Sequence, residues 1–376
     1  DVRAGEARVN VRSAGAGRRW RCTCAGGGAF QHEGLAERRV HAGDRTAVVA
    51  DGVADATTGI SRGGTAALTV NTGSTVTTSA LRVSATGTGD LAASGGGGTG
   101  SGGTARMTVG GASSTLSAKA IDIDASGFGG GVKTVSGVTT TANVGGDGQG
   151  GSALLTVQAG GSLNAQNNVA LNANGVGGYG SVQSGDGTGG TARLTIANGT
   201  TSFGSTLTTL SALGIGSGSF SQSPVGTFFS PNGGDGTGGT AEVLINAGNS
   251  ATLNLGTLGL NVSGFGGGAG GSENVRGGSA TGGTANISVD GGVSVGVDDL
   301  AVDAGGQSGG ASSPSSLTGL SGNAQGGTIT IAATGASTLR ATGDLYADAS
   351  GNVVAADNVG TGAGGDVTIS ATSGAT

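Results

Sequence analysis

The chain has 376 residues, of which 87 are Gly and only 3 are Pro, and charged residues make up 11% of it. Average Gly usage is about 7%, so this chain is strongly enriched, and its low charge content excludes disorder driven by charge repulsion. From Gly63 onward, 16 acidic residues oppose 7 basic ones. A nucleic-acid partner is therefore not expected, because phosphate-binding faces need clustered basic side chains.

Residues 1–45 form an atypical flank rich in Arg, Ala and Gly, and they contain nine of the 17 Lys and Arg residues. Two interpretations stay open: a coding region read out of frame, and a disordered flank or capping element. Cys22, Cys24, His32 and His41 lie here. Their spacing matches no standard zinc pattern, and a C-x-C disulfide would be strained. No metal site is therefore predicted in this flank.

Residues 46–376 read as a repeat. A Gly-Gly marker followed by Thr, Ser or Asp begins at residues 63, 102, 150, 189, 238, 282, 326 and 364. After each marker an apolar residue occupies every second position, as in Ala105, Met107 and Val109, and the positions between are mostly polar. Period two predicts a strand with one buried face.

A second alternating run follows in most repeats, after a turn that usually contains Gly. Leu81–Ala85, Ile121–Ala125 and Leu300–Ala304 are examples, whereas the repeat that starts at residue 189 keeps this run poorly. A Gly-rich segment of variable length then closes each repeat and accounts for the uneven spacing of the markers. Helices are nearly excluded, because Gly costs about 1 kcal/mol at a helix interior position.

These patterns predict an all-β fold, specifically a right-handed parallel β-helix, or solenoid, with Gly-rich loop excursions. An antiparallel sandwich would not need the same strand pattern to restart at every marker, whereas stacked coils do. A coil of three short strands takes roughly 20–25 residues. Each repeat is therefore either one coil with a long excursion or two coils.

The segment Gly185–Gly190 fits the spelling G-x-G-x-x-G of a phosphate-binding loop. Such a loop follows a strand and opens a helix, whose N-terminus holds the phosphate. Here the segment ends a Gly-rich excursion and Thr191–Ile196 continues as a strand pattern. We therefore interpret the double Gly as the bend where each repeat re-enters the stack.

The cadence Gly-Gly-Thr-Ala-x-Leu-Thr-Val followed by Leu-x-Val-x-Ala-x-Gly resembles the Gly-rich β-strand repeats in passenger regions of large bacterial surface proteins. These proteins are autotransporters and filamentous haemagglutinin-like adhesins. The resemblance covers residues 63–376. It implies a β-helix on the bacterial cell surface and an adhesive or stalk-like role, and it implies no particular ligand. Because the signal peptide and membrane barrel of that family are not in this sequence, we expect a fragment of something longer.

No catalytic residue is predicted. The repeats contain no Cys or His, so neither a Ser-His-Asp nor a Cys-His nucleophile can be assembled there. A polysaccharide-acting β-helix enzyme with paired carboxylates remains an alternative, although basic residues and aromatic platforms are scarce. Three Asp pairs fall at outward strand positions or matching repeat positions: Asp122 with Asp124, Asp298 with Asp299, and Asp303 with Asp348.

Calcium is the other alternative, and no further cofactor is expected. Asp147, Asp186 and Asp235 lie in Gly-rich turns, and carboxylates with turn carbonyls are the oxygen ligands that Ca²⁺ prefers. Each Asp precedes the double Gly, however, and the nine-residue period of calcium-binding β-helix repeats is missing. These three residues are the only metal-site candidates in the repeats.

The sequence thus predicts a non-enzymatic structural or adhesive segment of an extracellular bacterial surface protein. It would serve as a rigid β-helical stalk or as a contact surface. The expected partners are a host or neighbouring-cell surface, or further copies in end-to-end self-association, because cut coils expose unpaired strand edges. Neither nucleic acid nor membrane insertion by this segment is expected.

Overall fold

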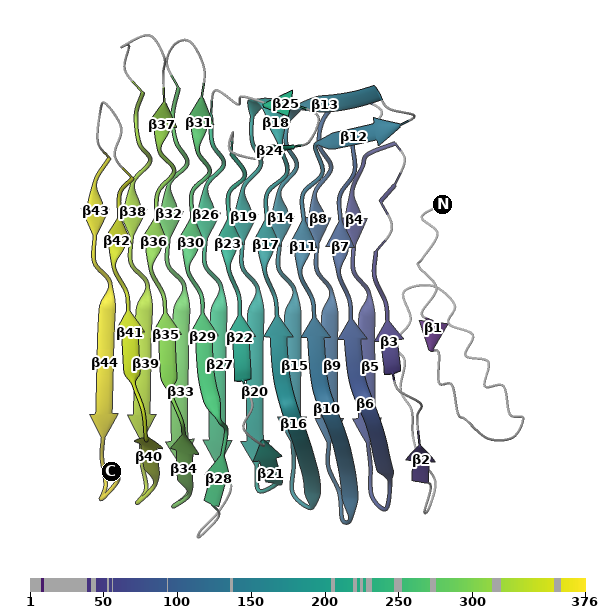
Figure 1. Ribbon diagram of the computed structural model, residues 1–376, viewed down its shortest axis with the longest axis vertical. Helices are drawn as coiled ribbons and strands as arrows, with labels where there is room; N and C mark the ends of the chain where they lie inside the picture. Colours follow the sequence, from purple (N-terminus) through teal and green to yellow (C-terminus); the bar gives the residue numbers. More distant parts are fainter. Residues whose placement is uncertain are drawn as a thin grey trace.

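The computed structural model shows a parallel β-helix, which confirms the predicted fold class (Figure 1). It describes residues 8–9, 39–41 and 45–376 except 53, 56, 93, 136–137, 204–206, 219–221, 224–225, 228–231, 247–251, 271–274, 313–318 and 355–359. No helix occurs among these residues, and so none that could span a membrane. Most of the predicted flank, including Cys22, Cys24 and His32, lies outside the described residues.

Each repeat forms one coil, which decides between the two coil lengths left open by the sequence. β9 (Thr104–Val109) pairs in parallel with β5 (Thr65–Val70) of the preceding repeat and β15 (Ser152–Val157) of the following one. The strands after consecutive markers are thus direct neighbours, with no coil between them. Within one coil, β8 (Gly100–Ser101) leads into β9, then β10 (Ser114–Asp124) and then β11 (Gly127–Phe128). An excursion then returns the chain to the next coil.

Four parallel sheets result. Sheet 1 contains the strands that follow the Gly-Gly markers, and each begins two residues after its marker starts. Its members are β5, β9, β15, β20 (Thr191–Ala197), β27 (Thr240–Asn246), β33 (Thr284–Asp290), β39 (Thr328–Ala333) and β44 (Asp366–Ala371).

Sheet 2 contains the second alternating runs. Its main strands are β3 (Arg45–Val49), β6 (Thr75–Ser84), β10, β16 (Gly161–Asn172), β22 (Leu207–Ser211), β29 (Thr257–Asn261), β35 (Leu300–Asp303) and β41 (Leu345–Asp348). Short strands extend sheet 2 or precede its strands in the coil, and β1 among them is antiparallel to β3. They are β1 (Arg8–Val9), β2 (Arg39–His41), β21 (Thr200–Phe203), β28 (Thr252–Asn254), β34 (Ser294–Val297) and β40 (Thr338–Ala341).

Sheets 3 and 4 consist of two-residue strands and form the narrow half of each coil. Sheet 3 holds β7 (Gly87–Thr88), β11, β17 (Gly175–Val176), β23 (Gly214–Ile215), β30 (Gly264–Phe265), β36 (Gly306–Gln307) and β42 (Gly351–Asn352). Sheet 4 holds β4 (Ser61–Arg62), β8, β14 (Gly148–Gln149), β19 (Gly187–Thr188), β26 (Gly236–Thr237), β32 (Ala280–Thr281), β38 (Ala324–Gln325) and β43 (Gly362–Ala363).

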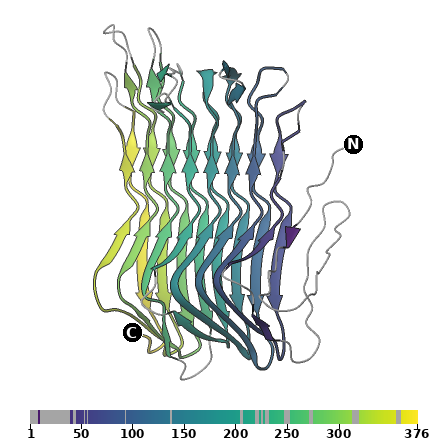
Figure 2. The same ribbon diagram turned by 45° about the vertical axis from the view of Figure 1, so that its right-hand side comes forward.

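The excursions all leave between sheets 3 and 4, at the upper edge in Figures 1 and 2. Nearly all of the variation in repeat length lies there, since positions 129–147 separate β11 from β14 but only positions 177–186 separate β17 from β19. Some excursions carry short strands of their own: β12 (Val132–Val135), β13 (Val138–Val144), β18 (Gly180–Gln183), β24 (Gln222–Ser223), β25 (Gly226–Thr227), β31 (Ala269–Gly270) and β37 (Ala311–Ser312).

The apolar core lies between sheets 1 and 2. Alternate residues of each strand point inward, so Met107 and Leu155 of sheet 1 and Ile121 and Leu171 of sheet 2 are fully buried. Because successive coils pair in register, each inward side chain stacks on its equivalent, as Leu155 does on Met107 and Leu194. The period-two patterns therefore create one continuous aliphatic core.

The repeat that starts at residue 189 departs from this rule. In β22, Thr208 takes the inward position of the Leu, Ile or Val found in the neighbouring coils, and it is fully buried, whereas Leu207 is exposed. The Thr208 hydroxyl donates to the Leu255 carbonyl at 3.2 Å, which satisfies it inside the core. The second run is thus present here with a polar substitute.

Sheets 3 and 4 pack backbone against backbone. A Cβ atom added to Gly127 of sheet 3 would lie far inside contact distance of the Gln149 carbonyl oxygen of sheet 4. The same holds for Gly148 against the Val176 carbonyl oxygen. Glycine is therefore needed here for close approach of two main chains.

The Gly-Gly markers close the wide half of each coil. The second Gly of each marker donates its N–H across the coil to the carbonyl at the end of a sheet 2 run, as Gly103 does to Ala85 at 2.7 Å and Gly151 to Ala125 at 2.7 Å. Gly189 and Gly190 connect β19 to β20, so Gly185–Gly190 leads into a strand. It therefore lacks the helix that a phosphate-binding loop requires.

We expect Gly127→Ala to destabilise the fold by about 3 kcal/mol, because the new methyl group would force sheets 3 and 4 apart. Gly259→Ala is the matched control, since a Cβ there would meet only the Thr209 Cγ2 at 3.7 Å. That substitution should be neutral or stabilising by about 0.5–1 kcal/mol. Urea denaturation followed by circular dichroism measures both, and equal effects would contradict the close packing of the narrow half.

Candidate functional site

A column of polar residues marks the point where sheet 2 ends and the chain bends into sheet 3. In this column, the last residue of a sheet 2 strand uses a side-chain oxygen to accept the N–H of the residue two positions later. Asp124 accepts from Ser126 at 3.0 Å, Asn261 from Ser263 at 3.1 Å, Asp303 from Gly305 at 2.9 Å and Asp348 from Ser350 at 2.8 Å. Asp and Asn favour such turns because their short side chains reach nearby backbone. These residues therefore shape the bend.

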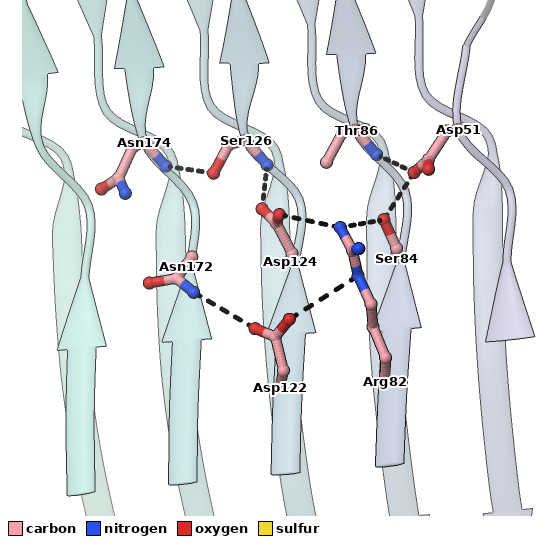
Figure 3. A network of polar contacts seen from close by, with 9 residues as sticks. All are labelled: Asp51, Arg82, Ser84, Thr86, Asp122, Asp124, Ser126, Asn172 and Asn174. Atoms are coloured by element: carbon pink, nitrogen blue, oxygen red, sulfur yellow. Dashed lines mark hydrogen bonds and ion pairs between the residues drawn. The ribbon is translucent and has the colours of Figure 1, made fainter. Parts of the chain in front are cut away.

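A wider polar network surrounds this column on the outer face of the first coils (Figure 3). Arg82 of β6 lies between two carboxylates of β10, with its Nε 3.6 Å from Asp122 Oδ2 and its Nη2 3.6 Å from Asp124 Oδ2. Asn172 of β16 donates to Asp122 Oδ1 at 3.4 Å from the other side. Three neighbouring coils are thus connected by side chains as well as by backbone.

Asp51 anchors the N-terminal end of this network. Its Oδ1 accepts the Ser84 hydroxyl at 2.6 Å and the Thr86 N–H at 2.8 Å. Farther along the stack, the Ser126 hydroxyl accepts the Asn174 N–H at 3.3 Å, and Asn174 Oδ1 accepts the Leu213 N–H at 2.8 Å. Most oxygens of the network accept hydrogen bonds from the next coil or from their own turn.

Asp122 is the residue of this network to consider for acid–base chemistry. Partial burial raises the pKa of Asp122 and the negative charge of Asp124 raises it further, whereas Arg82 and Asn172 oppose the rise in pKa. A raised pKa is one property of carboxyl groups that act as general acids. Its side chain is nevertheless 44% exposed, and Asp124, its predicted companion, holds the backbone turn.

The other two predicted Asp pairs have structural contacts of their own. Asp303 and Asp348 are register partners on neighbouring coils, as their repeat positions indicate. Asp303 Oδ1 also accepts the Ser263 hydroxyl at 2.6 Å, and Asp348 Oδ2 accepts the Tyr346 hydroxyl at 3.0 Å. Asp299 accepts the N–H of Asp344 on the next coil at 2.9 Å. Asp298 follows β34, and its main chain bonds to Gly256 and Gly343.

The three calcium candidates come together as one column. They precede β14, β19 and β26, where Asp147 accepts the Asp186 N–H at 3.0 Å and Asp186 accepts the Asp235 N–H at 2.7 Å. Ser279 then donates its N–H to Asp235 at 2.6 Å. Each carboxylate thus stabilises the start of the next sheet 4 strand. In the described part of the chain, no three His, Cys, Asp or Glu side chains form a group that could hold a metal ion.

Period-two analysis found the outward Asp positions but missed the partners that make the network. Asp122 has Arg82 as its register partner on one neighbouring coil and Ala170 on the other. These register partners can be read from the sequence only once the repeats are aligned by their second runs. Asp51 precedes the first marker and carries no repeat signal. Comparison of the chain with protein-family models, curated proteins and solved structures finds no match.

We expect Asp124→Ala to cost about 1 kcal/mol of unfolding free energy, because the Ser126 N–H would lose its acceptor at the bend. Asp124→Asn keeps a side-chain oxygen and loses only the 3.6 Å ion pair with Arg82, whose side chain is 51% exposed, so the loss is small. It should therefore stay within about 0.5 kcal/mol of the parent. Equal urea midpoints for the two variants would contradict a turn-forming role.

The acidic columns predict opposite pH effects at two positions. Desolvation raises the pKa of Asp186 above its usual 3.8, and the charges of Asp235 and Asp147 add to the rise, although the Asp235 N–H opposes it. Hydrogen bonds, first from the Ser350 side chain, lower the pKa of Asp348. Folding therefore favours the protonated form of Asp186 and the ionised form of Asp348.

Asp186→Asn should raise stability relative to the parent at pH 7, with the gain vanishing as the pH falls below about 4. Asp348→Asn should lower stability at pH 7, with the loss shrinking as the pH falls below 3.8 and through the lowered pKa of Asp348. Both variants keep an oxygen acceptor, so the charge is what changes. Thermal midpoints between pH 3 and 7 measure the two differences, and differences of the same sign would contradict the assignment.

Proposed function

We propose that this chain is a non-enzymatic structural or adhesive segment of an extracellular bacterial surface protein. The observation that carries the proposal is the unbroken register of sheet 1, in which eight strands pair in parallel from β5 to β44. Such a stack resists bending because every coil is hydrogen-bonded to its neighbours through four parallel sheets. The sequence resemblance to passenger regions of autotransporters and haemagglutinin-like adhesins supports the same setting.

The excursions are the proposed contact surface. Their described parts lie along one edge of the stack (Figures 1 and 2), and the strands β13 and β18 pair there across neighbouring coils. Val144 and Val182 of these strands are 49% and 53% exposed. Loops held by a rigid scaffold are common binding elements. The partner that we propose is the surface of a host or neighbouring cell.

The polar network argues for a structural role over catalysis. Asp124, Asp303 and Asp348 form turns, and Asp147, Asp186 and Asp235 accept backbone N–H groups. The backbone N–H groups that these carboxylates accept account for their positions without a substrate or Ca²⁺. The polysaccharide-acting and calcium-binding alternatives therefore become outcomes of the experiment.

We expect beads coated with the chain to attach to bacterial or epithelial cells, and V144D/V182D to weaken attachment. An apolar anchor lost from the contact surface should reduce attachment about tenfold, which corresponds to ~1.4 kcal/mol. Leu207→Asp is the matched control, because Leu207 is 47% exposed on sheet 2, away from the excursions.

Equal attachment by the parent and V144D/V182D would refute the proposal that the excursions form the contact surface. Release of reducing ends from bacterial or plant polysaccharides by the purified chain would overturn the non-enzymatic proposal. Loss of strand signal in a chelator, restored by Ca²⁺, would favour the calcium alternative.

A further inference from the structure

The coil formed by β20, β21, β22 and β23, called here the junction coil, carries two hydroxyl groups inside the core. Thr208 is fully buried between its register partners Val169 and Leu258, and Thr201 is buried beside Leu163. The Thr208 hydroxyl donates to a carbonyl of the next coil, whereas the Thr201 hydroxyl has no hydrogen-bond partner within the described part of the chain. A buried hydroxyl without a partner lowers stability, so this coil is a weak point of the core.

Backbone pairing is also reduced where the sheet 2 side of the junction coil meets the next coil. β22 shares five register pairs with β29, whereas β10 and β16 share ten. β21 pairs with β16 and β28 pairs with β34. Although β21 and β28 lie in adjacent coils (Figure 1), no register pair joins them among the described residues. The sheet 2 side of this interface is therefore held mainly by β22 and β29.

The sheet 1 side of the same interface is continuous. β20 and β27 share seven register pairs, and Leu194 stacks on Val243 in the core, where both are fully buried. On the outer face, the Arg193 guanidinium forms an ion pair with the Glu242 carboxylate across the two coils. The junction coil is therefore bonded to the next coil more firmly through sheet 1 than through sheet 2.

We propose that this interface is a hinge, at which the stack bends by opening sheet 2 between β22 and β29 while sheet 1 stays paired between β20 and β27. Opening lets water reach Thr201 and Thr208, so hydration of their hydroxyls offsets part of the cost. The same opening between β10 and β16 would expose aliphatic side chains and break more backbone pairs. Thr46 and Thr78 are buried hydroxyls as well, but they bond to each other at 3.3 Å.

Hydrogen exchange followed by mass spectrometry tests the opening in the full chain. Amides of β22 and β29 should exchange at least about tenfold faster than those of β10 and β16, whereas β20 and β27 should be protected like β9 and β15. T201V/T208V should slow exchange in β22 about tenfold, because opening would no longer hydrate a buried hydroxyl. Equal protection of β10 and β22 would overturn the proposal.

Thr209→Val is the matched control for this pair of substitutions. It makes the same chemical change on the same strand, but Thr209 lies between the buried positions 208 and 210 and is itself partly exposed. Exchange in β22 should therefore match the parent in this variant. Slowing of exchange by Thr209→Val as large as that by T201V/T208V would assign the effect to strand propensity and would contradict a hinge set by the core.

Spin-label distances distinguish bending toward one side from uniform fraying. Ala170→Cys with Tyr346→Cys labels sheet 2, and Thr156→Cys with Ala332→Cys labels sheet 1, with the two native cysteines replaced by Ser. Each pair spans four coil steps across the junction coil. Pulsed electron paramagnetic resonance should give a broad distribution with a longer component for the sheet 2 pair and a narrow one for the sheet 1 pair.

Adding T201V/T208V to the labelled chain should narrow the sheet 2 distribution, because the hinge closes when the core of the junction coil is apolar. Two equally narrow distributions would overturn the proposal, as would a broad sheet 2 distribution that T201V/T208V leaves unchanged. The hinge concerns motion within the stack and does not rest on the proposed partner, so either result leaves the proposed contact surface standing.

Discussion

The close contact between the backbones of sheets 3 and 4 is the constraint on which the rest of the structure depends. Two main chains approach so closely that Gly127 and Gly148 leave no room for a Cβ atom. The coil is therefore wide where sheets 1 and 2 enclose aliphatic side chains and narrow where glycines meet. This explains how a chain with 87 Gly and few aromatic residues folds around an aliphatic core: side chains fill one half of the coil, and backbone fills the other.

Much of this architecture could be predicted from the sequence. The Gly-Gly markers located all eight strands of sheet 1, and the second runs located most main strands of sheet 2 but not β3 or β22, because period two reports a half-buried strand directly. The number of coils per repeat could not be predicted, since the two-residue strands of sheets 3 and 4 are too short to show a period. Thr208 was hidden because its burial depends on a hydroxyl partner, the Leu255 carbonyl, in another coil.

Part of the candidate site was also predictable from the period-two pattern. Outward Asp positions follow from alternation within a strand, so Asp122, Asp124 and Asp303 were found. Their neighbours on other coils depend on register, which a variable excursion obscures in the sequence. Once the coils are aligned, Asp147, Asp186 and Asp235 fall in one column and bond to successive backbone N–H groups. A motif that suggested ligand binding thus belongs to the hydrogen bonding between coils.

The restriction of length variation to one edge has a consequence for how such a chain can change. Every coil crosses from sheet 4 through sheets 1 and 2 to sheet 3 along a path of nearly constant length. The path back from sheet 3 to sheet 4 varies, from positions 353–361 after β42 to positions 216–235 after β23. Insertions at this edge therefore leave every strand in register, and the entropic cost of a longer loop grows only slowly with length. A stack of this kind could therefore carry foreign peptides, and one peptide placed in each of several successive excursions would stand in a row at coil spacing.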